Sequence, residues 1–290
     1  MQYLVNALVA GLSYVLVGIG LGLVLRVCGF LHMAHGILYT VGAYAAYVGV
    51  RFAGLSGVGS VILAVAATGL LGIVLQRFVY QGLQRVRGSG LGLLLVSLAV
   101  YVVCQNLLSL FFGDETKIVD MEDSIRVRTI VGARITTLQL GALSVTCVLC
   151  AGWLILLTYS ALGRQIRAVA SDRELAGICG VPAERIALCS AGLAAMLAGA
   201  GGCFVALDTG LSPTMGMRVM MMGLVALVVG GVDGWAGVMV GAIALALGQQ
   251  GASVLLGSQW QDAFAFVLLL VCLLVRPQGV FGRSVRKVTV

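Results

Sequence analysis

Runs of apolar residues, each about as long as a bilayer is thick, repeat along nearly the whole chain. They lie at about 3–25, 36–50, 58–76, 90–112, 138–158, 186–207, 217–232, 235–256 and 262–275. A helix needs about 20 apolar residues to cross the hydrocarbon core of a bilayer. The 290 residues therefore have room for eight or nine crossings and little else. This pattern predicts an all-α polytopic integral membrane protein, built as one transmembrane domain over residues 1–290.

Composition excludes the soluble classes of protein. Hydrophobic residues make up 60% of the chain and charged residues 10%, whereas soluble domains contain about 25% charged residues. A soluble protein of this size could not hide so much apolar side chain. A soluble enzyme and a nucleic-acid-binding protein are thus excluded. Neither of the two lysines lies in a GxxxxGK[ST] motif, so we do not expect this chain to hydrolyse ATP itself.

Basic residues gather between the apolar runs and predict the topology. Residues 76–88 hold three arginines and no acid, and residues 160–186 hold four arginines. By the positive-inside rule these segments and the basic C-terminus are predicted to be cytoplasmic, while the mixed-charge loop 113–137 faces the periplasm. Nine crossings with the N-terminus outside satisfy these assignments. The number of crossings becomes even if run 36–50 or run 217–232 is re-entrant and does not cross the bilayer.

Forty-one glycines against three prolines indicate helices that pack closely. Small residues four positions apart let helix backbones approach each other in lipid. Three such pairs stand out: Gly18 with Gly22, Ala195 with Gly199, and Gly237 with Gly241.

Both histidines of the chain, His32 and His35, lie in a polar interruption between the first two runs, next to Gly36. Irregular backbone at membrane depth is tolerated where it lines a cavity, which favours a broken helix beside a solute path. A plain cytoplasmic turn explains the same residues equally well. A metal site is disfavoured, because it needs three or four ligands and the sequence offers no third one nearby.

A glycine-dense tract follows the seventh run and holds a single acid, Asp233. It predicts a tight turn between two helices. The resemblance described below implies that Gly230, Gly231 and Asp233 border the translocation path, together with His32, His35 and Gly36.

The longest segment predicted to be cytoplasmic, 160–186, contains a capping-box pattern at Ser171 and Glu174. The pattern predicts a short helix from Asp172 to Cys179, with a glycine and a proline ending it. A solvated loop with interfacial helices is one interpretation; a docking element for a cytoplasmic partner is the sharper one. Its expected coupling residues are Arg164, Arg167, Asp172, Glu174, Leu175 and Ile178.

Apart from the histidines, the predicted crossings hold almost no ionisable residue at mid-depth. Ion-coupled carriers need such groups inside the membrane, and a nucleophile with a matching base is not evident for an intramembrane enzyme. The chain therefore looks like a passage that is powered from elsewhere. A stand-alone channel or facilitator is the rival, but a channel has no use for an ATPase dock at 160–186.

Four segments, in order along the chain, resemble the branched-chain amino-acid ABC transporter permeases. Residues 30–44 are similar to that family's N-F-A-H-G…G-A-Y stretch, and residues 162–181 to its cytoplasmic coupling segment. Residues 227–241 resemble its glycine tract, and residues 276–283 its terminal P-x-G-x-x-G.

The resemblance implies an inner-membrane permease subunit of a bacterial importer for branched-chain or other hydrophobic amino acids. It implies a second related permease, as homodimer or heterodimer, two cytoplasmic ATPase subunits that use ATP and Mg, and a periplasmic solute-binding protein. The chain itself is expected to bind no cofactor or metal and to be non-catalytic. His32 and Met33 replace the family's Asn-Phe, and Ile37 and Asp233 also depart from its pattern. Urea, short amides and other amino acids therefore stand as alternative solutes.

Overall fold

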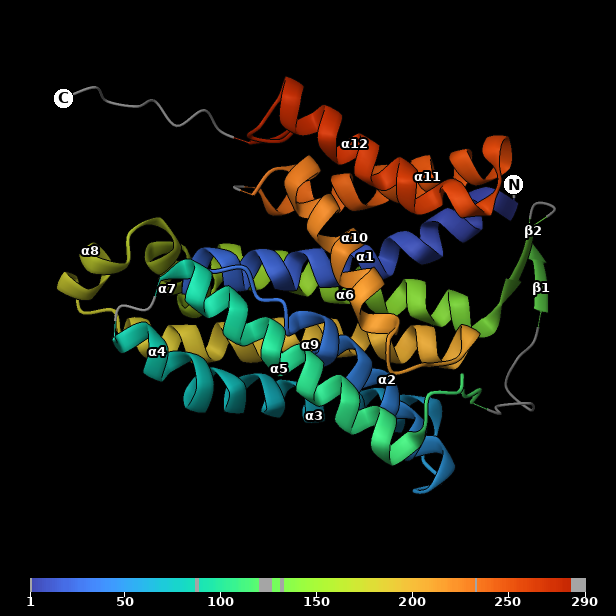
Figure 1. The fold of residues 1–290 in the computed structure, drawn as a ribbon, viewed down its shortest axis with the longest axis horizontal. Coiled ribbons are helices and arrows are strands. Elements are labelled where there is room, and N and C mark those ends of the chain that lie inside the picture. Colours follow the sequence, from blue (N-terminus) through green and yellow to red (C-terminus); the bar gives the residue numbers. More distant parts are fainter. Residues whose placement is uncertain (1, 87–88, 120–126, 131–132, 233, 283–290) are drawn as a thin grey trace.

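The computed structural model describes residues 2–86, 89–119, 127–130, 133–232 and 234–282. Most helices run along the longest axis of the molecule (Figure 1). Seven helical segments of the described chain are long and apolar enough to cross a bilayer. They are α1 (Gln2–Cys28), α3 (Gly57–Leu75) with its extension, α5 (Gly90–Phe112), α6 (Thr137–Tyr159), α9 (Ala183–Thr209), α11 (Trp235–Leu256) and α12 (Gln261–Val275) with the 3-10 turn before it (Ser258–Trp260). Two shorter helices, α2 (His35–Arg51) and α10 (Met215–Gly230), complete the bundle, which confirms the predicted polytopic helical fold.

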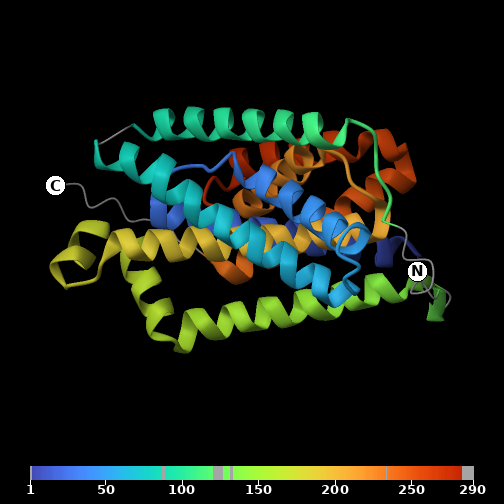
Figure 2. The same ribbon diagram turned by 90° about the horizontal axis from the view of Figure 1, so that it is seen from below.

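The bundle has two distinct ends (Figures 1 and 2). One end, which we call the α8 end, carries α4 (Gln81–Arg85), α7 (Ala161–Ser171) and α8 (Arg173–Ile178). The other, the hairpin end, carries the N-terminus and the strands β1 (Val127–Ile130) and β2 (Ala133–Thr136). The arginine-rich segments thus share one end and the mixed-charge loop lies at the other, as the charge distribution predicts. Which end faces the cytoplasm stays a prediction.

We expected segment 76–88 to be a loop, but its residues 76–85 continue the preceding helix. A π-helical turn (Gln76–Tyr80) joins α3 directly to α4. Glutamine, arginine and leucine favour helix, and no proline interrupts the segment, so the helix extends beyond the apolar run.

Loop 113–137 also differs from expectation, because it contains a two-stranded antiparallel ribbon. Val127 pairs with Thr136, and Ile130 with Ala133. Alternating β-branched residues and arginines favour strand there. This ribbon is the exception to the helical fold within the described ranges.

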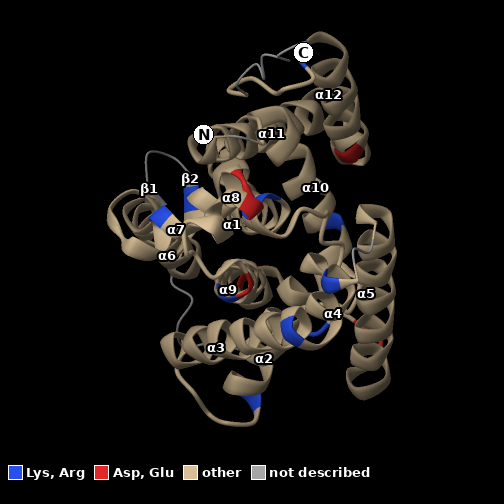
Figure 3. Ribbon diagram, turned by 90° about the vertical axis from the view of Figure 1, so that its left-hand side faces the viewer, with Lys and Arg blue, Asp and Glu red and all other residues tan. Residues whose placement is uncertain are grey.

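Helix α9 lies in the middle of the bundle (Figure 3) and packs on α1, α2 and α3. Small residues make these contacts possible. A side chain at Gly199 would overlap Thr68 of α3, and one at Gly42 of α2 would overlap the backbone of Gly199 itself. Close backbone approach through small residues drives helix packing in lipid, where the hydrophobic effect between helices is absent.

The predicted small-residue pairs all lie at helix contacts, which confirms that interpretation. Gly18 faces Gly223 and Val238, and Gly22 faces Leu227. Close contacts with neighbouring helices are also made by the remaining members, which are Ala195, Gly199, Gly237 and Gly241.

Candidate functional site

The second crossing is broken. Helix α1 ends at Cys28, Gly29 adopts the left-handed conformation (φ +77°), and α2 begins only at His35. The ring of His35 lies against Gly20, because a Cβ built there would sit 2.7 Å from His35 Nε2. Gly20 precedes the end of α1 by about 12 Å, at 1.5 Å per residue. The non-helical residues 29–34 therefore run back into the bundle before α2 starts.

Helix α2 then continues to the opposite end of the bundle. Its last residue, Arg51, lines the same surface pocket as Lys117, which belongs to the loop at the hairpin end. The non-helical segment therefore leads into a helix that runs from inside the bundle to the hairpin end.

Ser97 of α5 holds the non-helical segment in place. Its hydroxyl accepts a hydrogen bond from the Met33 backbone N–H (3.0 Å) and donates one to the Leu94 carbonyl (2.8 Å). A backbone N–H buried among apolar helices needs such a partner. Ser97 is fully buried. Sequence reasoning missed it, although Ser97 is the first polar residue within run 90–112 and could have been singled out.

Both histidines are buried, with His32 only 5% exposed and His35 not exposed at all. The His32 ring packs edge-on against Tyr80 of the π-helical turn (centroids 5.0 Å apart) and lies 6.1 Å from His35. Nδ1 of His32 has no hydrogen-bond partner among the described residues. Leaving a buried polar atom unpaired is costly, which singles out the His32 ring within this apolar interior. No group of three metal-ligating side chains occurs within the described ranges.

Gly36 lies where the two short helices begin side by side. A Cβ at Gly36 would sit 2.9 Å from the Gly216 carbonyl oxygen of α10 and 3.3 Å from Met220 Cβ. The Thr40 hydroxyl donates to the Gly36 carbonyl (3.2 Å). A larger residue at position 36 would separate the starts of α2 and α10.

The Gly230–Gly231 tract lies elsewhere, at the far end of α10. The C-terminal segment covers it: Val280 N–H bonds the Val229 carbonyl (2.8 Å) and Phe281 N–H bonds that of Gly230 (3.2 Å). Gly231 has a left-handed conformation (φ +100°). At 1.5 Å per residue, α10 separates this turn from Gly36 by about 20 Å. The structure therefore does not bring the two halves of the predicted path together. Asp233 lies outside the described residues.

Segment 160–186 forms the helices α7 and α8. Ile166 and Val169 of α7 are buried, while Arg164 and Arg167 lie on its exposed face. Arg164 also donates to the Tyr159 carbonyl at the end of α6 (3.2 Å).

The sequence pattern predicted Ser171 as the cap of this helix, and that prediction is wrong. Asp172, not Ser171, caps α8, and its Oδ1 accepts the backbone N–H groups of Glu174 and Leu175 (both 2.9 Å). Ser171 is instead the last residue of α7. A carboxylate accepts two N–H bonds and also complements the positive helix N-terminus, so it outcompetes the hydroxyl.

Helix α8 presents the expected apolar patch. Leu175 is 57% exposed and Ile178 83% exposed, whereas Ala176 faces the protein. Glu174 is exposed beside them. Gly180 (φ +82°) ends the helix, and Val181 N–H closes it onto the Ala176 carbonyl (2.9 Å).

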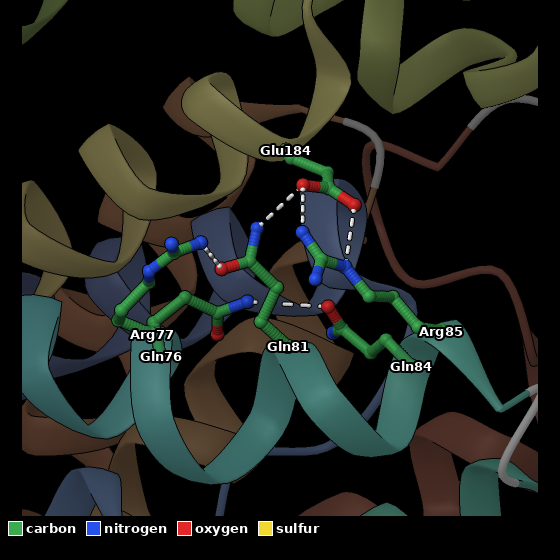
Figure 4. A network of polar contacts seen from close by, with 6 residues as sticks. All are labelled: Gln76, Arg77, Gln81, Gln84, Arg85 and Glu184. Atoms are coloured by element: carbon green, nitrogen blue, oxygen red, sulfur yellow. Dashed lines mark hydrogen bonds and ion pairs between the residues drawn. The ribbon is translucent and has the colours of Figure 1, made fainter.

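A polar network next to α8 was not predicted (Figure 4). Glu184, in the first turn of α9, accepts hydrogen bonds from Arg85 (2.8 and 3.0 Å) and from Gln81 (2.9 Å) of α4. Figure 3, which looks onto the α8 end, shows basic positions on α4 beside the start of α9. Three glutamines and two arginines in an acid-free segment are the sequence signal for it, but the acid that they bind is remote in the chain.

Known proteins match this chain over nearly its whole length. Residues 3–273 match the family described as "Branched-chain amino acid transport system / permease component". The high-affinity branched-chain amino acid transport system permease protein BraD of Pseudomonas aeruginosa is 28% identical, over 98% of this chain and 96% of the relative. The permease protein LivH of Salmonella typhimurium is 29% identical and that of Escherichia coli 28%, with the same coverage.

Among solved structures, "PsaBC from Streptococcus pneumoniae in complex with Fab" resembles the chain with a TM-score of 0.51. The match covers 97% of this chain and 94% of that one, at 12% sequence identity. At this identity the likeness concerns the fold alone.

Proposed function

The chain belongs to the family of permease components of branched-chain amino acid transport systems, and on that premise we propose that it forms part of the translocation path of an amino-acid importer. Branched-chain or other hydrophobic amino acids are the proposed solutes. A second related permease completes the path, two cytoplasmic ATPase subunits power it, and a periplasmic binding protein delivers the solute.

The observation that carries this proposal is the family match, which runs through nearly all the crossings rather than through one motif. The relatives named for branched-chain amino acid transport are matched over the same length. The arrangement of the chain agrees: the arginine-rich segments and a short helix with exposed apolar residues share one end of a bundle of apolar helices.

We assign α7 and α8 to the contact with the ATPase. The exposed side chains of Leu175 and Ile178 supply the apolar anchor, and Arg164, Arg167 and Glu174 supply charges around it. Asp172 acts indirectly, because it holds the first turn of α8.

We assign the broken second crossing to the border of the translocation path. The unpaired Nδ1 of His32 and the irregular backbone of 29–34 place polar groups inside an apolar bundle, which membrane proteins tolerate where a cavity or solute path needs them. Gly36 maintains the contact between α2 and α10 there. We also assign Gly230 and Gly231 to the border of the path, at the turn that follows α10, together with Asp233, their neighbour in sequence.

Reconstitution tests the proposal. Proteoliposomes holding this chain, its partner permease and the ATPase subunits, with the binding protein added, should accumulate labelled leucine, isoleucine or valine only when ATP is supplied on the ATPase side. Competition with urea, short amides and other amino acids then ranks the alternative solutes. Uptake by this chain alone without ATP would instead show a facilitator and overturn the proposal.

A further inference from the structure

The polar network at the α8 end connects three crossings that are far apart in sequence. Its six members are Gln76, Arg77, Gln81, Gln84, Arg85 and Glu184 (Figure 4). Within the extension of α3, Gln76 donates to Gln84 (3.2 Å), and Arg77 donates to Gln81 (2.8 Å). Gln76 and Gln81 are buried. Buried side-chain amides are stable only when they are hydrogen-bonded, so these contacts fix the geometry of the extension.

The network reaches the end of α1 on one side. Gln84 Nε2 donates to the carbonyl of Cys28 (3.4 Å), the last residue of α1, whose carbonyl would otherwise lack a helical partner. The Cys28 thiol in turn contacts the Oε1 of Gln76 (3.9 Å).

On the other side the network reaches α8. Glu184 follows the end of α8 by only six positions, and the intervening residues include Gly180 and the N-cap Pro182. Arg173, at the start of α8, lines the same surface pocket as Glu184. A displacement of α8 therefore reaches Glu184 through a short stretch of chain.

The π-helical turn links the network to the broken crossing. Gln81 N–H bonds the carbonyl of Gln76, five residues back, and this wider turn holds Tyr80 inward. The Tyr80 ring is fully buried and lies 5.1 Å from Phe30 and 5.0 Å from His32, both in the non-helical segment. Such π-helical turns occur frequently at functional sites.

The ion pair between Arg85 and Glu184, at the surface of this network, contributes little to the stability of the fold. The side chains of Arg85 and Glu184 are 59% and 46% exposed, and ion pairs with that much solvent contribute little to stability. The chain offers a matched comparison: Arg218 of α10 and Asp262 of α12 form an ion pair of nearly the same length (2.9 Å against 2.8 Å) and nearly the same exposure, 60% and 45%. The hydrogen bonds of that second pair join α10 to α12.

We propose that the Arg85–Glu184 pair is the tie through which movement of α8 reaches residues 29–34, with Gln81, Gln76 and Tyr80 as the intermediate contacts. Coupling between distant sites travels through such contiguous packed and hydrogen-bonded groups. Arg85 and Glu184 are positioning residues in this scheme, since neither contacts the solute. The inference rests on the proposed function, because α8 moves only if an ATPase drives it.

The test measures solute imported per ATP hydrolysed, in proteoliposomes holding the complete transporter. Glu184→Gln and Arg85→Gln should keep the ATPase bound and its hydrolysis rate within about twofold of the unaltered chain, yet lower the import-to-hydrolysis ratio at least tenfold. Asp262→Asn, the matched control, should leave the ratio unchanged. The exchanged pair, Arg85→Glu with Glu184→Arg, should recover most of the ratio.

Each of these measurements either supports the proposed tie or overturns it. A normal ratio in Glu184→Gln overturns the tie, as does a loss of the same size in Asp262→Asn. If Glu184→Gln fails to assemble, the exchanged pair decides, and its failure to restore import overturns the tie as well. Absence of ATP-driven uptake by the unaltered transporter would refute the proposed function itself, which separates the two failures.

Discussion

Replacing Ile178 with aspartate should weaken binding of the ATPase more than any change of a charge on the same helix. Ile178 is the most exposed apolar side chain of α8, and Leu175 lies three residues before it on the same short helix. Ile178 is the last residue of α8, and the substitution leaves both the cap at Asp172 and the closing Gly180 in place.

The expected magnitude follows from exposure. Fully burying an isoleucine or leucine side chain contributes about 1.5–3 kcal/mol. Scaled by the exposed fractions of 83% and 57%, docking gains roughly 1.2–2.5 kcal/mol from Ile178 and roughly 0.9–1.7 kcal/mol from Leu175. Losing the first corresponds to an affinity lower by roughly 8- to 70-fold, before the cost of desolvating the new carboxylate. An exposed ion pair contributes only about 0–1 kcal/mol, which is at most about fivefold.

The assay titrates the ATPase against the permease complex in lipid nanodiscs and measures Kd, with ATP-driven uptake measured in parallel. Glu174→Gln is the matched control, because it removes one charge from the same helix at nearly constant volume. An unchanged Kd and normal uptake in Ile178→Asp, at normal membrane level, would remove α8 from the mechanism. A larger loss in Glu174→Gln than in Ile178→Asp would show that charge, not apolar contact, dominates the interface.

Three further predictions concern the rest of the chain. A cysteine placed at Glu115 in a background without native cysteines should react with an impermeant reagent from outside, and one at Gln84 should not; the reverse pattern in sealed cells would invert the topology. Gly36→Leu should reduce uptake at least tenfold with the protein still inserted, because a Cβ there already meets the neighbouring helix, while Gly141→Leu, with nothing within 4 Å, should transport normally; equal uptake by both would contradict the role of Gly36. Ser97→Ala should lower thermal stability of the purified complex by about 1–3 kcal/mol, the cost of an unpaired buried N–H, and an unchanged melting temperature would mean that water replaces the hydroxyl.

Much of the candidate site could be predicted because it depends on local sequence. The amphipathic spacing of Ile166 and Val169 is enough to predict that α7 buries one face, and the exposed residues of α8 follow from an apolar pair among charges. The residue that caps α8 could not be predicted from the sequence, because Ser171 and Asp172 are adjacent and only the geometry of the turn selects Asp172.

The broken crossing shows where prediction from sequence stops. Glycines and histidines between two apolar runs fit a turn outside the membrane as well as a coil inside it. The choice depends on depth, and depth is set by contacts with other helices: His35 with Gly20 on α1, and Met33 with Ser97 on α5. Such contacts join residues that are remote in the chain.

The sequence by itself determined the crossings, the end of the bundle at which each arginine-rich segment lies and the small residues that pack. These features follow from how each stretch partitions between lipid and water, which is a property of the stretch alone. Only the tertiary structure decided that Glu184 meets Arg85, 99 residues earlier, and that Gly230 lies against the C-terminal segment rather than beside His32. Hydropathy carries no information on which polar or small residues of different helices face each other, because that pairing arises when the helices pack.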